Sequence, residues 1–176
     1  MIRRDLLTAT IACCTAAVGL DARATPPALT QTLDFGDWSF ALPADWKPAS
    51  SGIDGVTYLE SANGARGCYI KAMRFAPSPH RTAAEQAAHV QSIEKQSMTT
   101  GEQDQWRVVA ERSIPEGASL RSELDLFSKA RGYRVLSVVL TTESDFVQLT
   151  LHDYDCHDYS ASVEFFAPIA ASLHRR

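Results

Sequence analysis

The chain has 176 residues, of which 45% are hydrophobic and 22% are charged, and its formal net charge is −4. These values are typical of a single globular domain that has its own core. They argue against nucleic-acid binding, which depends on clustered lysine and arginine.

Residues 1–24 have the pattern of a secretory signal peptide. Arg3 and Arg4 form a positive start, residues 6–20 form an apolar stretch, and small side chains precede a cleavage position after Ala24. As a helix the stretch would be about 22 Å long, which is short for a hydrocarbon core of about 30 Å. We therefore expect a periplasmic or secreted protein with no membrane span in its mature form.

Three alternatives for this segment stay open. It could remain as an uncleaved anchor, it could use the twin-arginine route through Arg3 and Arg4 rather than the general route, or Cys13 or Cys14 could be lipidated. Cleavage would remove three arginines and two aspartates, so the remaining 152 residues would carry a net charge of about −5.

Beyond a flexible lead-in over residues 25–30, we expect a single α+β domain over residues 31–176. Alternating apolar residues predict strands at 38–42, 55–60, 68–75 and 106–111. Thr82 and Glu85 form a capping-box pattern, which predicts a helix from there to about Met98.

The second half of the chain predicts an antiparallel meander. Strands are expected at 120–129, 133–142 and 146–154 because short turns separate three runs rich in valine and leucine, and the middle run is apolar on both faces. Apolar residues then recur at helical spacing from Val163 to Leu173, with Pro168 marking a kink or a new helical start. The predicted architecture is a twisted antiparallel sheet flanked by a mid-chain helix and a C-terminal helix.

Cys68 and Cys156 are the only cysteines beyond the export segment. In an oxidising compartment a lone pair usually bonds, and closing a loop of about 90 residues would add roughly 4 kcal/mol of stability. The sequence predicts a Cys68–Cys156 disulfide, with two buried free thiols as the alternative.

The segment from His152 to Asp158 is rich in potential metal ligands. His152, Asp155, His157 and Asp158 are the candidates, because imidazole and carboxylate together suit zinc and similar ions. No recognised ligand spacing accompanies them, so we interpret the segment as a strand end followed by a turn, in which Asp158 or Ser160 caps a helix. We therefore expect no metal, cofactor or catalytic residue, since serine-nucleophile and phosphate-loop motifs are also missing from the sequence.

Two segments resemble a known fold group. The strand and turn Phe40-Ala41-Leu42-Pro43-Ala44-Asp45-Trp46 and the closing helix Phe165-Phe166-Ala167-Pro168-Ile169-Ala170-Ala171-Ser172-Leu173 together resemble the PsbP-like group, which includes DcrB-type envelope lipoproteins. The resemblance implies an antiparallel sheet flanked by helices and a mostly non-enzymatic role, and it supplies no catalytic residues. The poor lipid-attachment context of this chain departs from the DcrB-type pattern.

Three functions are compatible with this reasoning. The first is a non-enzymatic exported protein that binds a protein partner, in particular an immunity-type protein against a toxin delivered to the periplasm. The second is a carrier of a small ligand that uses the sheet face or a pocket beside Trp38, Trp46 and Trp106. The third is a metal-assisted envelope hydrolase built on the His152–Asp158 segment. The sequence favours the first.

Overall fold

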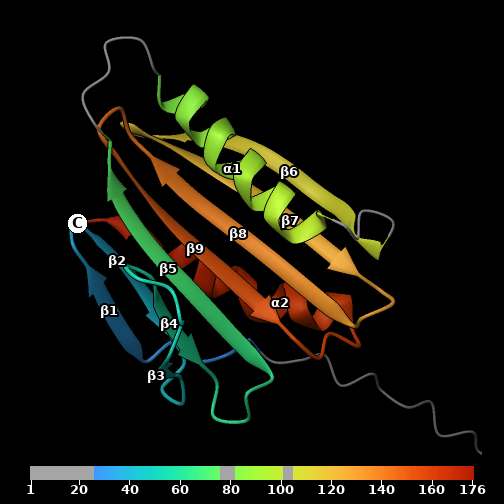
Figure 1. Ribbon diagram of the computed structural model, residues 1–176. Helices are drawn as coiled ribbons and strands as arrows, with labels where there is room; N and C mark the ends of the chain where they lie inside the picture. Colours follow the sequence, from blue (N-terminus) through green and yellow to red (C-terminus); the bar gives the residue numbers. More distant parts are fainter. Residues whose placement is uncertain (1–25, 76–81, 101–104) are drawn as a thin grey trace, which may run out of the picture.

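The computed structural model describes residues 26–75, 82–100 and 105–176, and it contains a seven-stranded sheet, a three-stranded sheet and two helices (Figure 1). The elements in chain order are β1 (Gln31–Phe35), β2 (Trp38–Leu42), β3 (Lys47–Ala49), β4 (Thr57–Glu60), β5 (Arg66–Arg74), α1 (Ala83–Thr99), β6 (Arg107–Glu116), β7 (Ser119–Ser128), β8 (Tyr133–Thr141), β9 (Asp145–Asp153), α2 (Tyr159–Ser172) and β10 (His174–Arg175). The predicted α+β class is confirmed.

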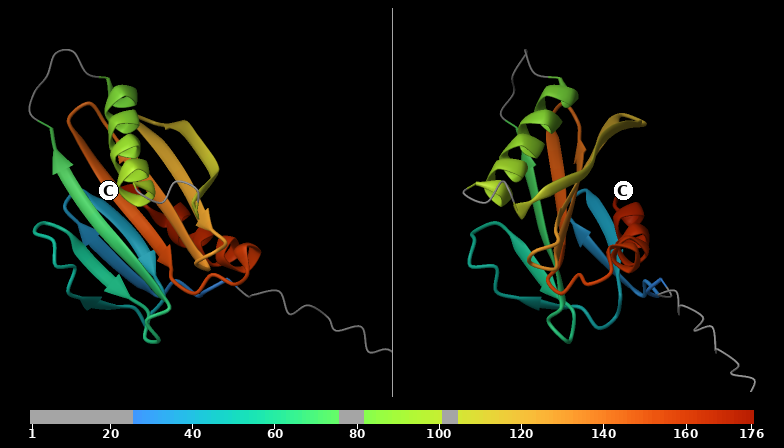
Figure 2. Two further views of the ribbon diagram at one scale, coloured as in Figure 1. Left: turned by 45° about the vertical axis from the view of Figure 1, so that its right-hand side comes forward. Right: turned by 90° about the vertical axis from the view of Figure 1, so that its right-hand side faces the viewer.

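The molecule has three layers, with the large sheet in the middle. Helix α1 covers one face, and α2 lies on the other face together with the small sheet (Figure 2). The large sheet has the order β3-β4-β5-β9-β8-β7-β6, and the small sheet has the order β1-β2-β10; every neighbouring pair is antiparallel.

The predicted meander is confirmed as β7–β8–β9, and β8 is buried on both faces as its sequence predicts. The export segment and the cleavage position after Ala24 lie outside the described residues. Within the described ranges, no helix has the length and apolar character needed to cross a membrane.

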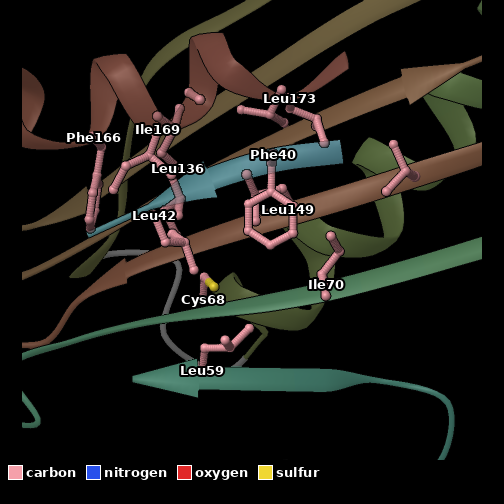
Figure 3. Close-up of a cluster of buried hydrophobic side chains, with 14 of the residues drawn as sticks. Phe40, Leu42, Leu59, Cys68, Ile70, Leu136, Leu149, Phe166, Ile169 and Leu173 are labelled. Atoms are coloured by element: carbon pink, nitrogen blue, oxygen red, sulfur yellow. The ribbon is translucent and has the colours of Figure 1, made fainter. Parts of the chain in front are cut away.

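The main core lies between the large sheet and the layer formed by α2 and β2. Phe40 and Leu42 of β2, together with Phe166 of α2, meet aliphatic side chains from β5, β8 and β9 (Figure 3). Alternation along the strands dictates this arrangement, because every second residue of a strand points to the same face. On β9, Leu149 and Leu151 point into this core. The alternate residues, such as Gln148, point toward α1.

Both helices begin as the sequence predicts. The Thr82 hydroxyl accepts from the Glu85 N–H and the Glu85 carboxylate accepts from the Thr82 N–H, which completes the capping box of α1. The Asp158 carboxylate caps α2 by accepting from the N–H groups of Ser160 and Ala161. Helix α2 continues through Pro168 rather than beginning anew there.

A buried ion pair joins β7, β8 and α2. The Arg134 guanidinium donates twice to the Asp125 carboxylate, at 3.1 and 2.8 Å, and once to the Ser162 hydroxyl at 3.3 Å. The Tyr159 hydroxyl also donates to Asp125, at 2.8 Å. Because every polar group of this cluster has a partner, the charges are compensated inside the protein.

The predicted Cys68–Cys156 disulfide is not present, and both thiols are free and buried. Cys68 is paired with Leu151 in the middle of the β5–β9 ladder and points into the main core (Figure 3). Cys156 lies past the end of β9, where its N–H donates to the Gly132 carbonyl on the β8 side, at 2.6 Å. The two thiols therefore have different surroundings, Cys68 inside the β5–β9 ladder and Cys156 in the turn between β9 and α2.

Asp125→Asn should destabilise the protein by about 3 kcal/mol, because it leaves the buried Arg134 cation without its counter-charge. Urea unfolding at neutral pH measures this as a lower midpoint with an unchanged slope. The matched control is Glu111→Gln in the exposed Lys95–Glu111 pair, which should change stability by less than about 1 kcal/mol. Equal effects of the two variants would contradict a structural role for the buried pair.

The free thiols should be unreactive until the protein unfolds. Burial raises the pKa of Cys68 to about 12 and also raises the pKa of Cys156, so little of either thiol is in the reactive thiolate form. For protein that begins at Thr25 and so lacks Cys13 and Cys14, iodoacetamide should therefore add nothing to the native form and two groups to the denatured, unreduced form, as measured by intact mass. A requirement for reductant before labelling would show that the cysteines are bonded after all.

Candidate functional site

The structure separates the residues of the proposed metal site. His152 is buried on the α1 face of β9, and Asp158 caps α2. Asp155 and His157 are exposed and pair with each other at 2.8 Å. Among the residues that the structure describes, no group of three or more His, Cys, Asp or Glu side chains could hold a metal ion.

The three tryptophans do not share a pocket. Trp38 and Trp46 are buried in the main core, on the α2 side of the large sheet. Trp106 packs on the other side, edge-to-face against Tyr133 with ring centroids 5.3 Å apart. The proposed ligand site beside all three residues is therefore not formed.

A different site lies on the α1 side, and we call it the α1 cleft. It has a volume of about 490 Å³ and lies between α1, the loop before β4, and the exposed part of β5 and β9. Its lining consists of Ile53 and Val56 from the loop, Tyr69 and Lys71 from β5, Ile93, Glu94 and Ser97 from α1, and Gln148, Thr150 and His152 from β9. The volume is in the range of small-ligand sites.

The floor of the α1 cleft is polar, although it lies in the middle of the sheet. The Gln148 amide donates to the Glu94 carboxylate at 2.8 Å, and it also lies 3.2 Å from the Ser137 hydroxyl and 3.3 Å from that of Thr150. On the opposite face, the alternate residues of β9 are aliphatic. Polar side chains beneath a helix have a desolvation cost, so their convergence on one cleft marks it as a candidate binding site.

Glu94 is the acidic group of the cleft, and its pKa is raised. Burial is the main cause, since desolvation disfavours the carboxylate, and the hydrogen bonds from Gln148 and Thr150 only partly offset it. Lys71 acts on Glu94 only through weak electrostatic attraction. Among the described residues, no basic side chain forms an ion pair with Glu94, so its carboxylate lacks a cation at contact distance.

A cluster of aromatic rings forms the wall beside the cleft. Its centre is His152, whose Nδ1 is 2.5 Å from the Tyr133 hydroxyl and whose ring packs against Tyr69 and Tyr154, with centroids 5.0 and 5.6 Å away. Tyr58 extends the cluster by stacking on Tyr69 at 4.5 Å. Burial lowers the pKa of His152 to about 4, so the imidazole is neutral at physiological pH, and burial raises the pKa of Tyr133.

A second concave surface, the α2 groove, lies on the other side of the sheet. It has a volume of about 600 Å³, and it is bounded by β6 and β7 on one side and by α2 on the other. Its charged residues are paired, Arg112 with Glu123 and Arg121 with Glu116, and Arg121 also donates to the carbonyls of Ala170 and Leu173 at the end of α2. Small and apolar side chains, including Ala110, Ile114, Val163, Ala167 and Ala171, line the space between them.

Strand β6 forms the edge of the large sheet next to this groove. All ten of its residues are exposed, and among the strands that the structure describes it pairs only with β7. Val108, Val109 and Ile114 are 38, 38 and 45% exposed, which is unusual for large apolar side chains on an open edge. A bulge between Val108 and Ala110 and a proline at position 115 interrupt the edge, so its free part covers residues 110–114.

The fold has a close counterpart among solved structures. The solution structure of cyanobacterial PsbP (CyanoP) from Synechocystis sp. PCC 6803 is similar, with a TM-score of 0.63 and 15% sequence identity over 92% of this chain and 99% of that chain. The resemblance to the PsbP-like fold is therefore confirmed, and at this identity the likeness concerns the fold alone.

A crystal structure from Bacteroides thetaiotaomicron VPI-5482 gives a TM-score of 0.42 and 12% identity over 80% of this chain and 45% of that chain, too low to support an argument. No protein-family model and no curated protein matches the chain.

Sequence reasoning did not find the α1 cleft. The signal was the alternation on β9, where Gln148, Thr150 and His152 place three polar residues on one face of a strand whose other face is aliphatic. Glu94 gives no signal by itself, because surface carboxylates are common on helices. Only the packing of α1 over the sheet brings it to the strand residues.

His152 should make the protein less stable in acid. Its pKa is about 4 when folded against an ordinary value of 6.5, so between these values the unfolded chain binds the proton that the folded chain excludes. Stability is therefore lost as the pH falls through this window, by about 3 kcal/mol from this residue.

The free energy of unfolding of His152→Gln, measured with urea between pH 6.5 and pH 4, should therefore fall by about 3 kcal/mol less than that of the unsubstituted protein. His157→Gln is the control, because His157 is exposed, and it should follow the unsubstituted protein. A parallel pH dependence for His152→Gln and the unsubstituted protein would contradict a neutral, buried His152.

Proposed function

We propose that this protein is a non-enzymatic binding protein that is exported to the periplasm and binds a protein partner through the free edge of β6. The single observation that carries the proposal is the fully exposed edge strand with large apolar side chains beside a groove. The signal-peptide pattern of residues 1–24 supports the compartment.

The occupant we propose is an extended segment of the partner, which adds to the sheet as a further strand. Proline lacks an N–H, so Pro115 is accommodated where its nitrogen faces away from β7. Backbone direction alternates along a strand, so Glu111 and Ser113 also present their N–H and C=O groups to the open edge. These groups can hold a segment of about five residues.

The α2 groove gives the added strand side-chain specificity. Ile114 and Ala110 face the groove from β6, and Ala167 and Ala171 face it from α2. Every second side chain of the partner segment would therefore lie over small apolar residues. The paired charges Arg112–Glu123 and Arg121–Glu116 leave the groove without a strong net charge, which favours apolar over charged side chains there.

The class of partner that best suits these features is a toxin delivered into the same compartment, which the domain would neutralise as an immunity protein. The small size, the negative net charge and the export pattern of the chain support this class, together with the free β6 edge. The metal-assisted hydrolase has no site in the described residues, because its candidate ligands lie apart: His152 is buried, Asp158 caps α2, and Asp155 pairs with His157.

The substitution Ser113→Pro tests whether the partner binds to the backbone of the β6 edge, because it removes one backbone hydrogen-bond donor. It should remove the outward N–H and weaken partner binding at least tenfold, or by about 1.4 kcal/mol. Ser113→Ala is the matched control, because it removes the same hydroxyl, which otherwise contacts that of Ser122 at 2.8 Å, but keeps the N–H. The alanine variant should bind normally.

The partner is first identified by photo-crosslinking in the periplasm from position 111 on β6, with position 47 on the opposite edge strand as the control. In the crosslinked complex, this chain should begin at Thr25. Binding of the partner should also protect the amides of residues 110–114 of this chain from hydrogen exchange. Unchanged affinity of Ser113→Pro, or a crosslinked species that is a second copy of this chain, would contradict the proposal.

A further inference from the structure

We propose that the α1 cleft binds a small organic ammonium ion that carries an apolar ring or chain. This site is independent of the β6 edge: it lies on the other face of the sheet and is built from α1, β5, β9 and the loop before β4. Two features of the cleft, an unpaired acidic group and an apolar mouth, specify the two ends of the ligand.

The group of the cleft that would bind the ammonium ion is Glu94. Its carboxylate accepts a hydrogen bond from the Gln148 amide at 2.8 Å, and among the described residues Lys71 acts on it electrostatically but no lysine or arginine lies within ion-pair distance of it. A partly desolvated carboxylate without a cation gains more from an ammonium ion than a solvated one does. The cleft therefore offers a charge-assisted contact that the protein itself does not use.

The surrounding groups favour a cation over an anion. His152 is neutral and buried, so it does not repel a positive charge, and among the described residues that line the cleft, Lys71 alone is basic. The Tyr69 ring lies in the lining as well, and the faces of aromatic rings attract cations. The net charge of −4 on the whole chain also attracts cations rather than anions.

The part of the cleft that would bind the apolar ring or chain is its mouth. Ile53 and Ile93 are 59 and 53% exposed, and they belong to the two elements that border the cleft, the loop before β4 and helix α1. Val56 adds a third apolar side chain. A hydrocarbon ring or chain between these residues would remove their surfaces from water, while its ammonium group reaches Glu94.

The ligand charge is tested with three molecules that share one hydrocarbon body: 4-phenylbutylamine, 4-phenylbutanol and 4-phenylbutyrate. Isothermal titration calorimetry on the purified protein should give the tightest binding for the amine, at least tenfold tighter than for the alcohol, and the weakest for the carboxylate. Equal binding of amine and alcohol, or tightest binding of the carboxylate, would overturn the proposal.

The site is tested with variants of the same protein. Glu94→Gln keeps the size of the side chain and should weaken the amine at least tenfold, but leave the alcohol unchanged. Lys71→Met removes the basic side chain that the structure places in the lining, so it should tighten binding of the amine. Amine binding that is indifferent to both variants would place the amine elsewhere and overturn the proposal.

Two further measurements test whether the amine binds to Glu94 in the α1 cleft rather than elsewhere on the protein. The amine should bind more tightly as the pH rises from acidic to neutral, because burial raises the pKa of Glu94 and its carboxylate forms only as the solution becomes less acidic, while His152 remains neutral. Ile114→Ala on β6 should leave amine binding unchanged, since Ile114 lies in the α2 groove. Failure of amine binding leaves the β6 proposal intact, because partner binding is measured separately.

Discussion

The antiparallel pairing of β5 with β9 is the constraint on which the rest of the structure depends. Nine residue pairs, from Arg66–Asp153 to Arg74–Asp145, join the first half of the chain to the last strand of the meander. Because side chains alternate between the faces, a slip by one residue would move Cys68 and Ile70 out of the main core and replace them with Tyr69 and Lys71. The same register sets Tyr69 opposite Thr150 and so forms the α1 cleft.

The two faces of this one sheet serve different purposes. Toward α2, the strands present aliphatic side chains that fill the main core, and burial of this kind is the largest favourable term in folding. Toward α1, β9 presents Gln148, Thr150 and His152, whose burial needs hydrogen bonds to be tolerated. The fold therefore concentrates its stability on one face, and this allows the other face to carry groups suited to binding.

Local signals predicted most of the elements, whereas long-range geometry remained out of reach. The capping box at Thr82, the buried β8 and the meander followed from neighbouring residues alone. Strand β3 contains a proline and β10 has only two residues, so neither has a pattern long enough to detect. The disulfide prediction rested on counting cysteines, and counting says nothing about where each thiol lies: in the structure both are free, Cys68 on β5 and Cys156 past the end of β9.

The position of α2 also has a consequence for the order in which the protein can form. Phe166, Ile169 and Leu173 belong to the main core, and β10 completes the small sheet by pairing with β2 near the opposite end of the chain. When everything up to β9 has left the ribosome, β2 can already cover part of the aliphatic face, but the part that lies under α2 is still exposed. The main core can therefore close only after Leu173 has emerged, so this domain folds as a unit late in its own synthesis.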